Sequence, residues 1–503
     1  MSFAWNIKKG FWNWIAITKF KGNKPAKIAV PRREPDDLAA VPFISKFKKI
    51  PVGNIVVPSR VPKDEASRLK YYFYQFQVGM YAVLSPMKKG MPPIDADAIK
   101  ALDQVYTKKH RKYFPIPTLP PQLAGTIDLG EFTVKGPFSG YLQKAPNGDY
   151  QWDFSSLAKY EHHPGLYSLG VKVLFRADQD NRKLRAYQIE SELGVTRPGD
   201  PEWELAKKIA LCAASNHTSL VRHFNWVHLA GGALSALITR NTFPGGHPIC
   251  RLLWQHIYGS QYSNEIVTLG QMAKGGDFPT TFCFTHAGMC KLFEEKYLDF
   301  SVLIHDPEMD AGERGVNGDD FDNPAQDNLE ALFNVIYRHT HRYLQHYYTT
   351  DDAIRHDAQI REWLEKLEKH MPNGIKKAIP KVTVANVARL AANFIYIGTV
   401  QHEVLGTHQW NYQLWVHKIP VRVYKNGQRV PIDVYARLVN ANFNLNVPRK
   451  QLTDDFSYMG LDEAGVGFFK QFQAELLELD EQLRKEPAMW KIYPTVLEAN
   501  MNA

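Results

Sequence analysis

The sequence predicts a mainly α-helical protein with a small β region, in which one large domain follows an N-terminal arm. Three observations carry this prediction. A nearly continuous apolar stretch of helical composition begins near residue 200, amphipathic segments follow it, and short alternating runs separated by turn signals precede it. The chain has 503 residues, 44% of them hydrophobic and 22% charged, so it is long enough to bury a large core.

Residues 1–66 are predicted to form a basic, aromatic and proline-rich arm. The chain has a net charge of +9, and near its start lysines alternate with Trp and Phe in KKGFWNWIAITKFKGNK. Indole rings settle at the headgroup level of a membrane while lysines meet anionic lipid, so this segment suits an anionic membrane surface. Residues 24–66 are rich in Pro and lack periodicity, which indicates an extended segment. No nucleic-acid motif accompanies the basic residues, so we expect no nucleic-acid partner.

The sequence predicts neither a membrane-spanning segment nor a secretory signal. No apolar run approaches the ~20 residues that cross a bilayer. The first residues also lack the uninterrupted apolar core of a signal peptide. We therefore expect a cytoplasmic protein that can associate peripherally with membranes. The four cysteines form no CxxC pair, which predicts buried thiols rather than zinc ligands or disulfides: Cys212, Cys250, Cys283 and Cys290.

Residues 67–503 are predicted to form the large helical domain. A small β region is expected at 115–175, where turn signals such as PNGD separate short alternating runs. From residue 200 an Asp-Pro-Glu helix start opens about forty largely apolar residues, which indicates one or two long buried helices. Further helices are predicted at 325–348, 353–371, 383–409 and 462–485.

Two histidines lie five residues apart in the apolar stretch, at His223 and His228. On a regular α-helix this spacing turns the side chains about 140° apart, so they could not share one ion. A π-turn adds one residue to the helical turn and brings such a pair to nearly one face, and π-turns are frequent at functional sites. The competing interpretation is a pair of buried histidines, each with its own hydrogen bond. The spacing alone does not separate these two interpretations.

The motifs around this pair together resemble the lipoxygenase family. WELAKKIA (203–210), followed by HTSLVRHFNWVH and HPICRLL, is similar to the family's Trp-x-Leu-Ala-Lys sequence, His-x4-His iron pair and His-Pro-Ile turn. RYLQHYYTTDDAIRHDAQIREWLEKL is similar to a later block. VANVARLAANFIYIGTVQHEVLGTHQW is similar to the helix that donates the third iron histidine, here His402. The motifs cover about residues 200–420, and the chain has no room for a lipid-binding β-sandwich, as in compact, bacterial-type members.

The resemblance implies a lipoxygenase-like helical catalytic domain over residues 67–503 with one non-haem iron, held by His223, His228 and His402. It implies a dioxygenase that removes a hydrogen atom from the methylene between two cis double bonds of a polyunsaturated fatty acid. O₂ then adds to the resulting radical, and the product is a hydroperoxide. The protein's part in this chemistry is to hold the methylene in place and to admit O₂ from one side.

Other residues acquire expected roles from the same resemblance. Gly275 and Gly276 lie near the family position that biases stereochemistry, so we expect them to contact substrate and to favour R products. His247 in the His-Pro-Ile turn is expected to be a structural hydrogen-bonding residue. Three further histidines match no ligand position and are expected to be solvated or to pack: His339, His341 and His346.

The remaining iron ligands are the point at which the chain departs from the family. Members place Asn, His or Ser four residues after the third histidine, whereas Gly406 here has no side chain to offer. The ligand in this position is then expected to be water or, if the helix unwinds, His408. Members also end in an isoleucine whose carboxylate binds iron. Here we expect the Ala503 carboxylate in that role, with Glu498 or Asn500 as the alternatives. Iron and manganese both remain open as the metal.

Two other functions stay open beside the fatty acid dioxygenase. Gly406 and the different C-terminal spacing would suit a divergent iron oxygenase with a substrate that is not a fatty acid. The basic, aromatic N-terminus would suit a catalytically silent lipid- or membrane-binding protein that keeps the helical scaffold.

Overall fold

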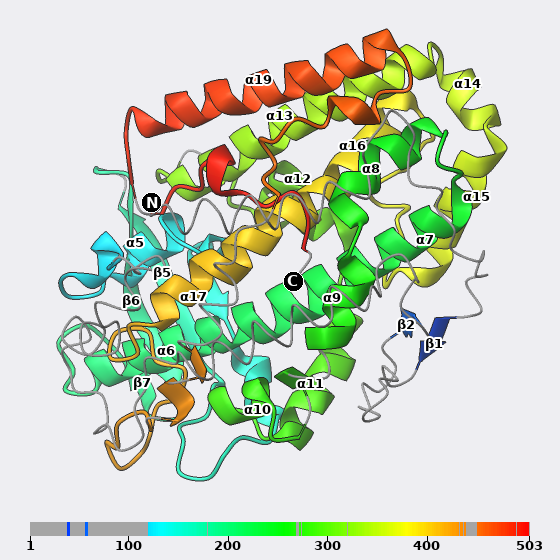
Figure 1. Ribbon diagram of the computed structural model, residues 1–503. Helices are drawn as coiled ribbons and strands as arrows, with labels where there is room; N and C mark the ends of the chain where they lie inside the picture. The colour runs from blue at the N-terminus through cyan, green and yellow to red at the C-terminus, as the bar shows by residue number, and fades with distance from the viewer. Residues whose placement is uncertain are drawn as a thin grey trace, which may run out of the picture.

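The structure of the protein is a computed structural model, and its described residues are mainly helical with one small antiparallel sheet (Figure 1). It describes residues 119–178, 180–267, 271–272, 274–318, 320–431, 433–435, 437–438, 450–488 and 490–501, with two short strands before them. These strands, β1 (Leu38–Ala40) and β2 (Val56–Pro58), pair antiparallel. The rest of the predicted 1–66 arm lies outside the described residues.

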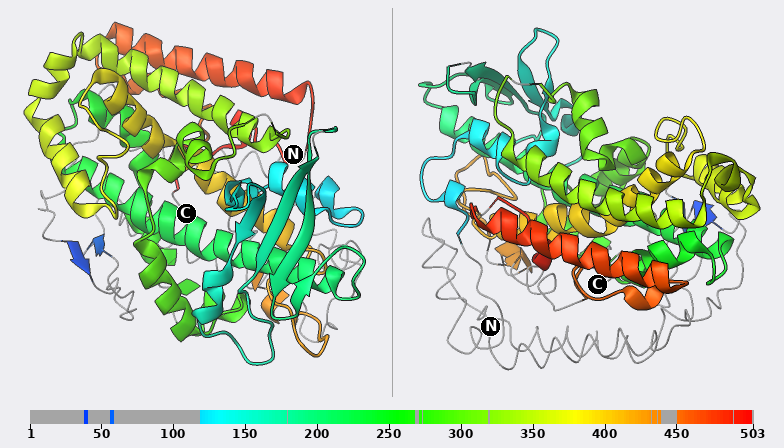
Figure 2. Two further views of the ribbon diagram at one scale, coloured as in Figure 1. Left: turned by 180° about the vertical axis from the view of Figure 1, so that it is seen from behind. Right: turned by 90° about the horizontal axis from the view of Figure 1, so that it is seen from above.

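The sheet is an antiparallel meander with the strand order β3-β4-β5-β6-β7. Its strands are β3 (Gln143–Lys144), β4 (Tyr150–Asp153), β5 (Lys172–Asp178), β6 (Lys183–Ser191) and β7 (Gly194–Thr196). The predicted β region of 115–175 was therefore too short at its end, because tight turns continue the meander to Thr196. Trp152, Val173 and Phe175 are fully buried. The sheet lies to one side of the helices (Figure 2).

One uninterrupted helical run forms the centre of the molecule. It consists of α6 (Trp203–His217), the π-helix η5 (Thr218–Ala233) and α7 (Leu234–Thr242). Every residue of η5 and α7 is buried. No Pro interrupts the run, and the apolar composition lets all its faces be covered by other elements. The sequence prediction of long, buried helices from residue 200 is confirmed.

A second helical run lies against the first. It consists of α16 (Val384–Tyr396), η8 (Ile397–Gln401), η9 (Val404–His408) and α17 (Gln409–Gln413), and η8 and η9 are π-helical. Both π-helical segments contact η5. Close approach depends on small residues, since a Cβ on Gly231 of η5 would come within 3.1 Å of the Ile397 side chain. The run from Val384 to Gln413 corresponds to the helix predicted at 383–409 and ends four residues later than predicted.

The other elements surround these two runs, and they include the remaining predicted helices. Those matching the predictions are α13 (Pro324–Tyr347) and α19 (Glu463–Arg484), whereas the helix predicted at 353–371 is divided into α14 (Asp351–His356) and α15 (Ala358–His370), because Asp357 ends the first and caps the start of the second. The others are η2 (Pro121–Leu123), α5 (Leu129–Val134), η3 (Ser139–Tyr141), η4 (Ser155–Lys159), α8 (Pro248–Ile257), α9 (Ser260–Val267), α10 (Asp277–Thr281), α11 (His286–Tyr297), η7 (Val302–His305), α12 (Pro307–Arg314), η10 (Ser457–Met459) and η11 (Pro494–Val496).

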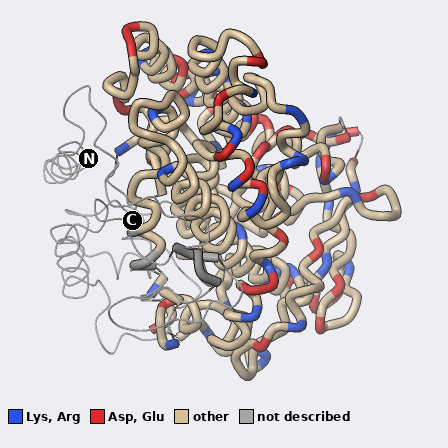
Figure 3. The backbone as a smooth tube through the Cα atoms, turned by 90° about the vertical axis from the view of Figure 1, so that its right-hand side faces the viewer, with Lys and Arg blue, Asp and Glu red and all other residues tan. Residues whose placement is uncertain are grey.

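The charged residues of the described chain are dispersed. Lys and Arg alternate with Asp and Glu along the backbone seen in Figure 3. Among the described residues, no helix has the length and apolar character that a membrane span requires. The four cysteines are free thiols, three of them buried and Cys290 half-buried, so the prediction of buried thiols is correct for three.

Candidate metal centre

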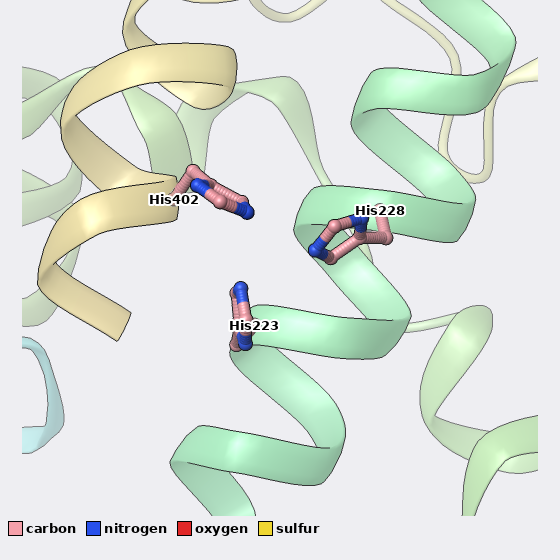
Figure 4. A group of neighbouring side chains, drawn as sticks. All are labelled: His223, His228 and His402. Carbon is pink, nitrogen blue, oxygen red and sulfur yellow. The ribbon is translucent and has the colours of Figure 1, made fainter. Parts of the chain in front are cut away.

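Three histidines from the two central runs meet in the interior of the protein. His223 and His228 come from η5, and His402 lies between η8 and η9. Their ring centroids are 4.9 to 5.1 Å apart. One nitrogen of each ring lies within 4.8 Å of the others, and the rings converge on a common point (Figure 4). We call these three residues the histidine group.

The π-helix is what brings two of them together. A regular α-helix would turn residues five apart away from each other, whereas the wider π turn puts them on nearly one face. The π-turn that His223 and His228 would need in order to share an ion is present. It is longer than the single turn expected, because η5 keeps the π geometry over 16 residues.

The electrostatics of the group suit neutral metal ligands. The exposed fractions of His223, His228 and His402 are only 7%, 3% and 2%. Burial, and secondarily the neighbouring His228, hold the pKa of His223 well below its usual range. The His223 Nε2 atom is buried and has no hydrogen-bond partner. An unsatisfied buried nitrogen is costly, and a metal ion at the common point would satisfy it. The three residues therefore fit a bound metal.

A buried asparagine orients His228. The His228 Nδ1 atom donates to Asn264 Oδ1 over 3.0 Å, and Asn264 Nδ2 donates to the His228 carbonyl over 2.9 Å. With its proton on Nδ1, the ring presents Nε2 as the ligand atom. The role of Asn264 could not be predicted from the sequence, because one amide within the polar stretch of α9 carries no spacing signal.

Asn264→Ala should lower metal affinity about 10–100-fold, because the His228 ring loses the partner that fixes its tautomer and orientation. The measurement is metal content by mass spectrometry after dialysis against a graded series of chelator concentrations. Ser260→Ala is the matched control, since Ser260 is buried on the same helix and its hydroxyl has no hydrogen-bond partner. Equal metal retention by the two variants would contradict a role for Asn264 in positioning the ligand.

Gly406 faces the histidine group, and His408 does not join it. A Cβ on Gly406 would lie 2.9 Å from His223 Nε2. His408 packs beside Tyr412, with 5.3 Å between ring centroids, and lies outside the group of converging nitrogens. Burial lowers the pKa of His408 to about 4. The unwinding that would be needed for His408 to bind is not observed, since residues 404–408 stay helical.

The C-terminal segment reaches the same region. Its backbone pairs with residues 450–452, and the Ala499 carbonyl accepts from His256 Nδ1 over 2.7 Å. Met501 then packs between the two central runs. A Cβ on Gly232 would come within 2.2 Å of the Met501 sulfur, and one on Gly398 within 3.8 Å of its methyl carbon. These glycines stand one helical turn from His228 and from His402, on η5 and η8.

The oxygen ligands predicted from the sequence are not found in the histidine group among the described residues. Among the described residues, no Asp, Glu or Cys joins the histidine group, so Glu498 is not a member. The Asn500 side chain donates to the Gln255 carbonyl over 2.8 Å. Ala503 lies outside the described residues, and its role as a ligand stays a prediction.

The structure also locates the other residues singled out in the sequence. His247 accepts from the Ile249 backbone and lies 3.3 Å from Asp357 and 3.2 Å from the Tyr348 hydroxyl, which confirms its structural role. His339 is buried and stacks on Phe472 with 4.2 Å between ring centroids.

The two remaining candidates for substrate contact lie before α10. Gly275 is exposed with φ +79°, and Gly276 is half-buried at the helix start. Their contact with substrate stays a prediction.

Known proteins resemble this chain in sequence over part of their length. No family model matches. The polyunsaturated fatty acid lipoxygenase ALOX15 of Oryctolagus cuniculus is 26% identical over 232 residues, which are 44% of this chain and 34% of the relative. The linoleate 9S-lipoxygenase 2 of Oryza sativa subsp. japonica is 24% identical over 331 residues, or 57% of this chain and 37% of the relative. The matches thus span about a third of the length of these relatives.

Solved structures show the same fold over most of the chain. The coral 8R-lipoxygenase structure superposes with a TM-score of 0.72 over 89% of this chain and 77% of its own, at 15% identity. The described helices and small sheet are therefore those of a lipoxygenase catalytic domain. The chain is thus similar to lipoxygenases in part of its sequence and shares the fold of their catalytic domain.

Proposed function

We propose that the protein is a non-haem iron dioxygenase that inserts O₂ into polyunsaturated fatty acids to give hydroperoxides. The observation that supports this most directly is the buried histidine group on two crossing helical runs, both of them π-helical beside the group. Three imidazoles with no thiolate among them suit iron, and ligand positions left open suit O₂ chemistry. The names of the sequence relatives support the substrate class.

The proposed centre assigns separate tasks to the residues around it. His223, His228 and His402 would hold the iron, and we propose the Ala503 carboxylate as a further ligand. When bound, the iron supplies the one-electron redox chemistry that O₂ insertion needs. Asn264 keeps the His228 proton on Nδ1, away from the metal. Burial of the group limits the access of water to a reactive radical.

Metal analysis together with a diene assay tests this function. Protein purified from iron-replete cells should hold about one iron per chain. Addition of linoleic or arachidonic acid should raise the conjugated-diene absorbance, because O₂ insertion moves one double bond into conjugation. His223→Ala should lose both signals while keeping the helical circular dichroism spectrum. Metal-free protein from such cells would refute the proposal.

Gly406 favours one alternative, a divergent iron oxygenase that acts on another substrate. The His223 ring lies so close to Gly406 that a Cβ there would come within 2.9 Å of Nε2, so this position offers no side-chain ligand and the surroundings of the metal differ from those in a member with a ligand there. Bound iron together with inertness toward polyunsaturated acids would favour this alternative. Retention of biological activity by the His223→Ala variant would instead favour the second alternative, a catalytically silent, lipid-binding protein.

We also propose that the N-terminus binds anionic membranes from the cytoplasmic side. Deletion of residues 1–24 should weaken binding to phosphatidylserine vesicles, because each lysine near the surface contributes about 1 kcal/mol. The difference should fade with added salt. Co-sedimentation at low and high salt measures it, and metal content serves as the control, since it should not change. Equal binding of both proteins at low salt would leave the segment without a membrane role.

A further inference from the structure

A recess that the histidine group does not line lies beside η5. It is a partly open cleft of about 450 Å³, lined by residues of η3, η5, η7 and α12. Tyr141, Arg222, Trp226 and Ile304 are among its lining residues, and the histidine group is not. We call it the Arg222 cleft.

Arg222 is a buried cation that no described carboxylate neutralises. Its exposed fraction is 5%, and its Nε atom has no hydrogen-bond partner. Its guanidinium carbon lies 5.2 Å from the centre of the Tyr141 ring, over the ring face. A buried guanidinium that is neither paired nor fully hydrogen-bonded is costly, and such groups are normally paired. The missing partner is therefore an anion from outside the described chain.

The other charges at the cleft are already balanced or solvated. Arg314 pairs with Asp310 over 2.8 Å and donates to a backbone carbonyl. Lys144 pairs with Asp320 over 3.3 Å. Glu313 is exposed, so water and salt screen its charge. Arg222 thus remains as the unbalanced charge in the buried part of the cleft.

The walls around Arg222 are fixed in place. A Cβ on Gly140 would come within 1.9 Å of Arg222 Nη1, so the absence of a side chain there makes room for the guanidinium. The Tyr141 hydroxyl lies 3.0 Å from His217 Nδ1, and Trp226 Nε1 donates to the Lys296 carbonyl over 2.7 Å. The two aromatic rings therefore stand as rigid apolar surfaces beside the cation.

We propose that the Arg222 cleft binds the carboxylate of an amphipathic carboxylic acid, whose apolar chain packs on Tyr141, Trp226 and Ile304. A single guanidinium offers two parallel N–H groups, which match one carboxylate. The apolar side chains beside the buried guanidinium lower the local dielectric constant and so strengthen the pair. The carboxylate can come from the proposed substrate or from a second, separate acid. Because the proposal depends on the cleft alone, it does not require bound iron or turnover.

Isothermal titration of the full-length protein with octanoate tests the site, with octanol as the uncharged ligand of equal chain length. Octanoate should bind at least about tenfold more tightly than octanol, because only the carboxylate pairs with Arg222. Arg222→Gln should weaken octanoate binding about ten- to a hundredfold, so that the advantage over octanol is lost. Arg251→Gln is the matched control: Arg251 is also buried with an unpartnered Nε, but it lies on α8, away from the cleft.

Gly140→Ala gives a second variant if Arg222→Gln does not fold. Its methyl group would push the flexible guanidinium out of place while keeping the charge, and it should weaken octanoate binding by a similar factor. Unchanged octanoate affinity in a folded Gly140→Ala or Arg222→Gln protein would overturn the proposal, as would equal affinity for octanoate and octanol.

Competition identifies the source of the carboxylate. Displacement of octanoate by linoleic acid, together with a raised KM at unchanged kcat in Arg222→Gln, would assign the site to the substrate. Binding of octanoate without competition would assign it to a separate acid, and either result requires the carboxylate site. Loss of the proposed dioxygenase function would leave the titration result intact, so the two proposals fail independently.

Discussion

His402→Ala should abolish metal binding, whereas His408→Ala should leave metal content within a few-fold of the parent. His402 contributes a nitrogen to the converging group, and its loss leaves two ligands from one helix. Two imidazoles hold iron far more weakly than three ligands drawn from two helices. His408 packs against Tyr412 outside the group, so removal of its ring should act only indirectly. Metal content by mass spectrometry, before and after dialysis, measures both variants, and diene formation should follow the metal.

The comparison between these two variants is decisive because the two histidines lie on neighbouring turns of the same helical run. Circular dichroism and thermal unfolding show whether each variant keeps its fold. Metal loss from His408→Ala as complete as from His402→Ala would make His408 a direct ligand. It would also mean that residues 404–408 rearrange when metal binds.

Gly406→Ala should lower metal affinity at least about tenfold, although it adds only one methyl group. The new Cβ would lie 2.9 Å from His223 Nε2 and 3.0 Å from Cε1, closer than real Cβ atoms come, so the ring must leave the position in which it faces the other two. Chelator competition on the metal-loaded protein measures the change in affinity.

Gly398→Ala is the control for this change. It is another buried glycine of the same helical run, and its Cβ would meet the His256 carbonyl at 3.1 Å instead of a ring of the histidine group. Both variants bear the cost of crowding, but only Gly406→Ala crowds a metal ligand. Equal affinity of the two variants for the metal would show that His223 can move without loss of binding.

The sequence predicted the part of the centre that is local or carried by motifs. The spacing of His223 and His228 would let the two share an ion only on a π-helix, and that helix is present. His402 could be predicted only from its motif, because nothing in the sequence between His228 and His402 shows that the two helices cross at these histidines. The helices themselves were predictable because their apolar periodicity and capping residues are local properties.

The surroundings of the centre were not predictable, because they depend on how distant segments pack. Asn264 bonds to His228 across two helices, and no pattern near it in the sequence marks this role. Arg222 looks like one more basic residue until its burial and lack of a partner are seen. The extent of the sheet beyond residue 175 was missed for a different reason, namely that only two of the nine residues of β6 are buried and that β7 has only three residues.

The position of Met501 sets an order of events during folding. It fills the space between Gly232 and Gly398, residues that are made long before it during synthesis. The two central helices can meet earlier, but the wall beside the histidines closes only when the far end of the chain has docked. Such contacts between sequence-distant segments form late, since their loop-closure entropy is offset only by the finished core. Until Met501 docks, the surface of the two helices between Gly232 and Gly398 therefore lacks the side chain that covers it in the folded protein.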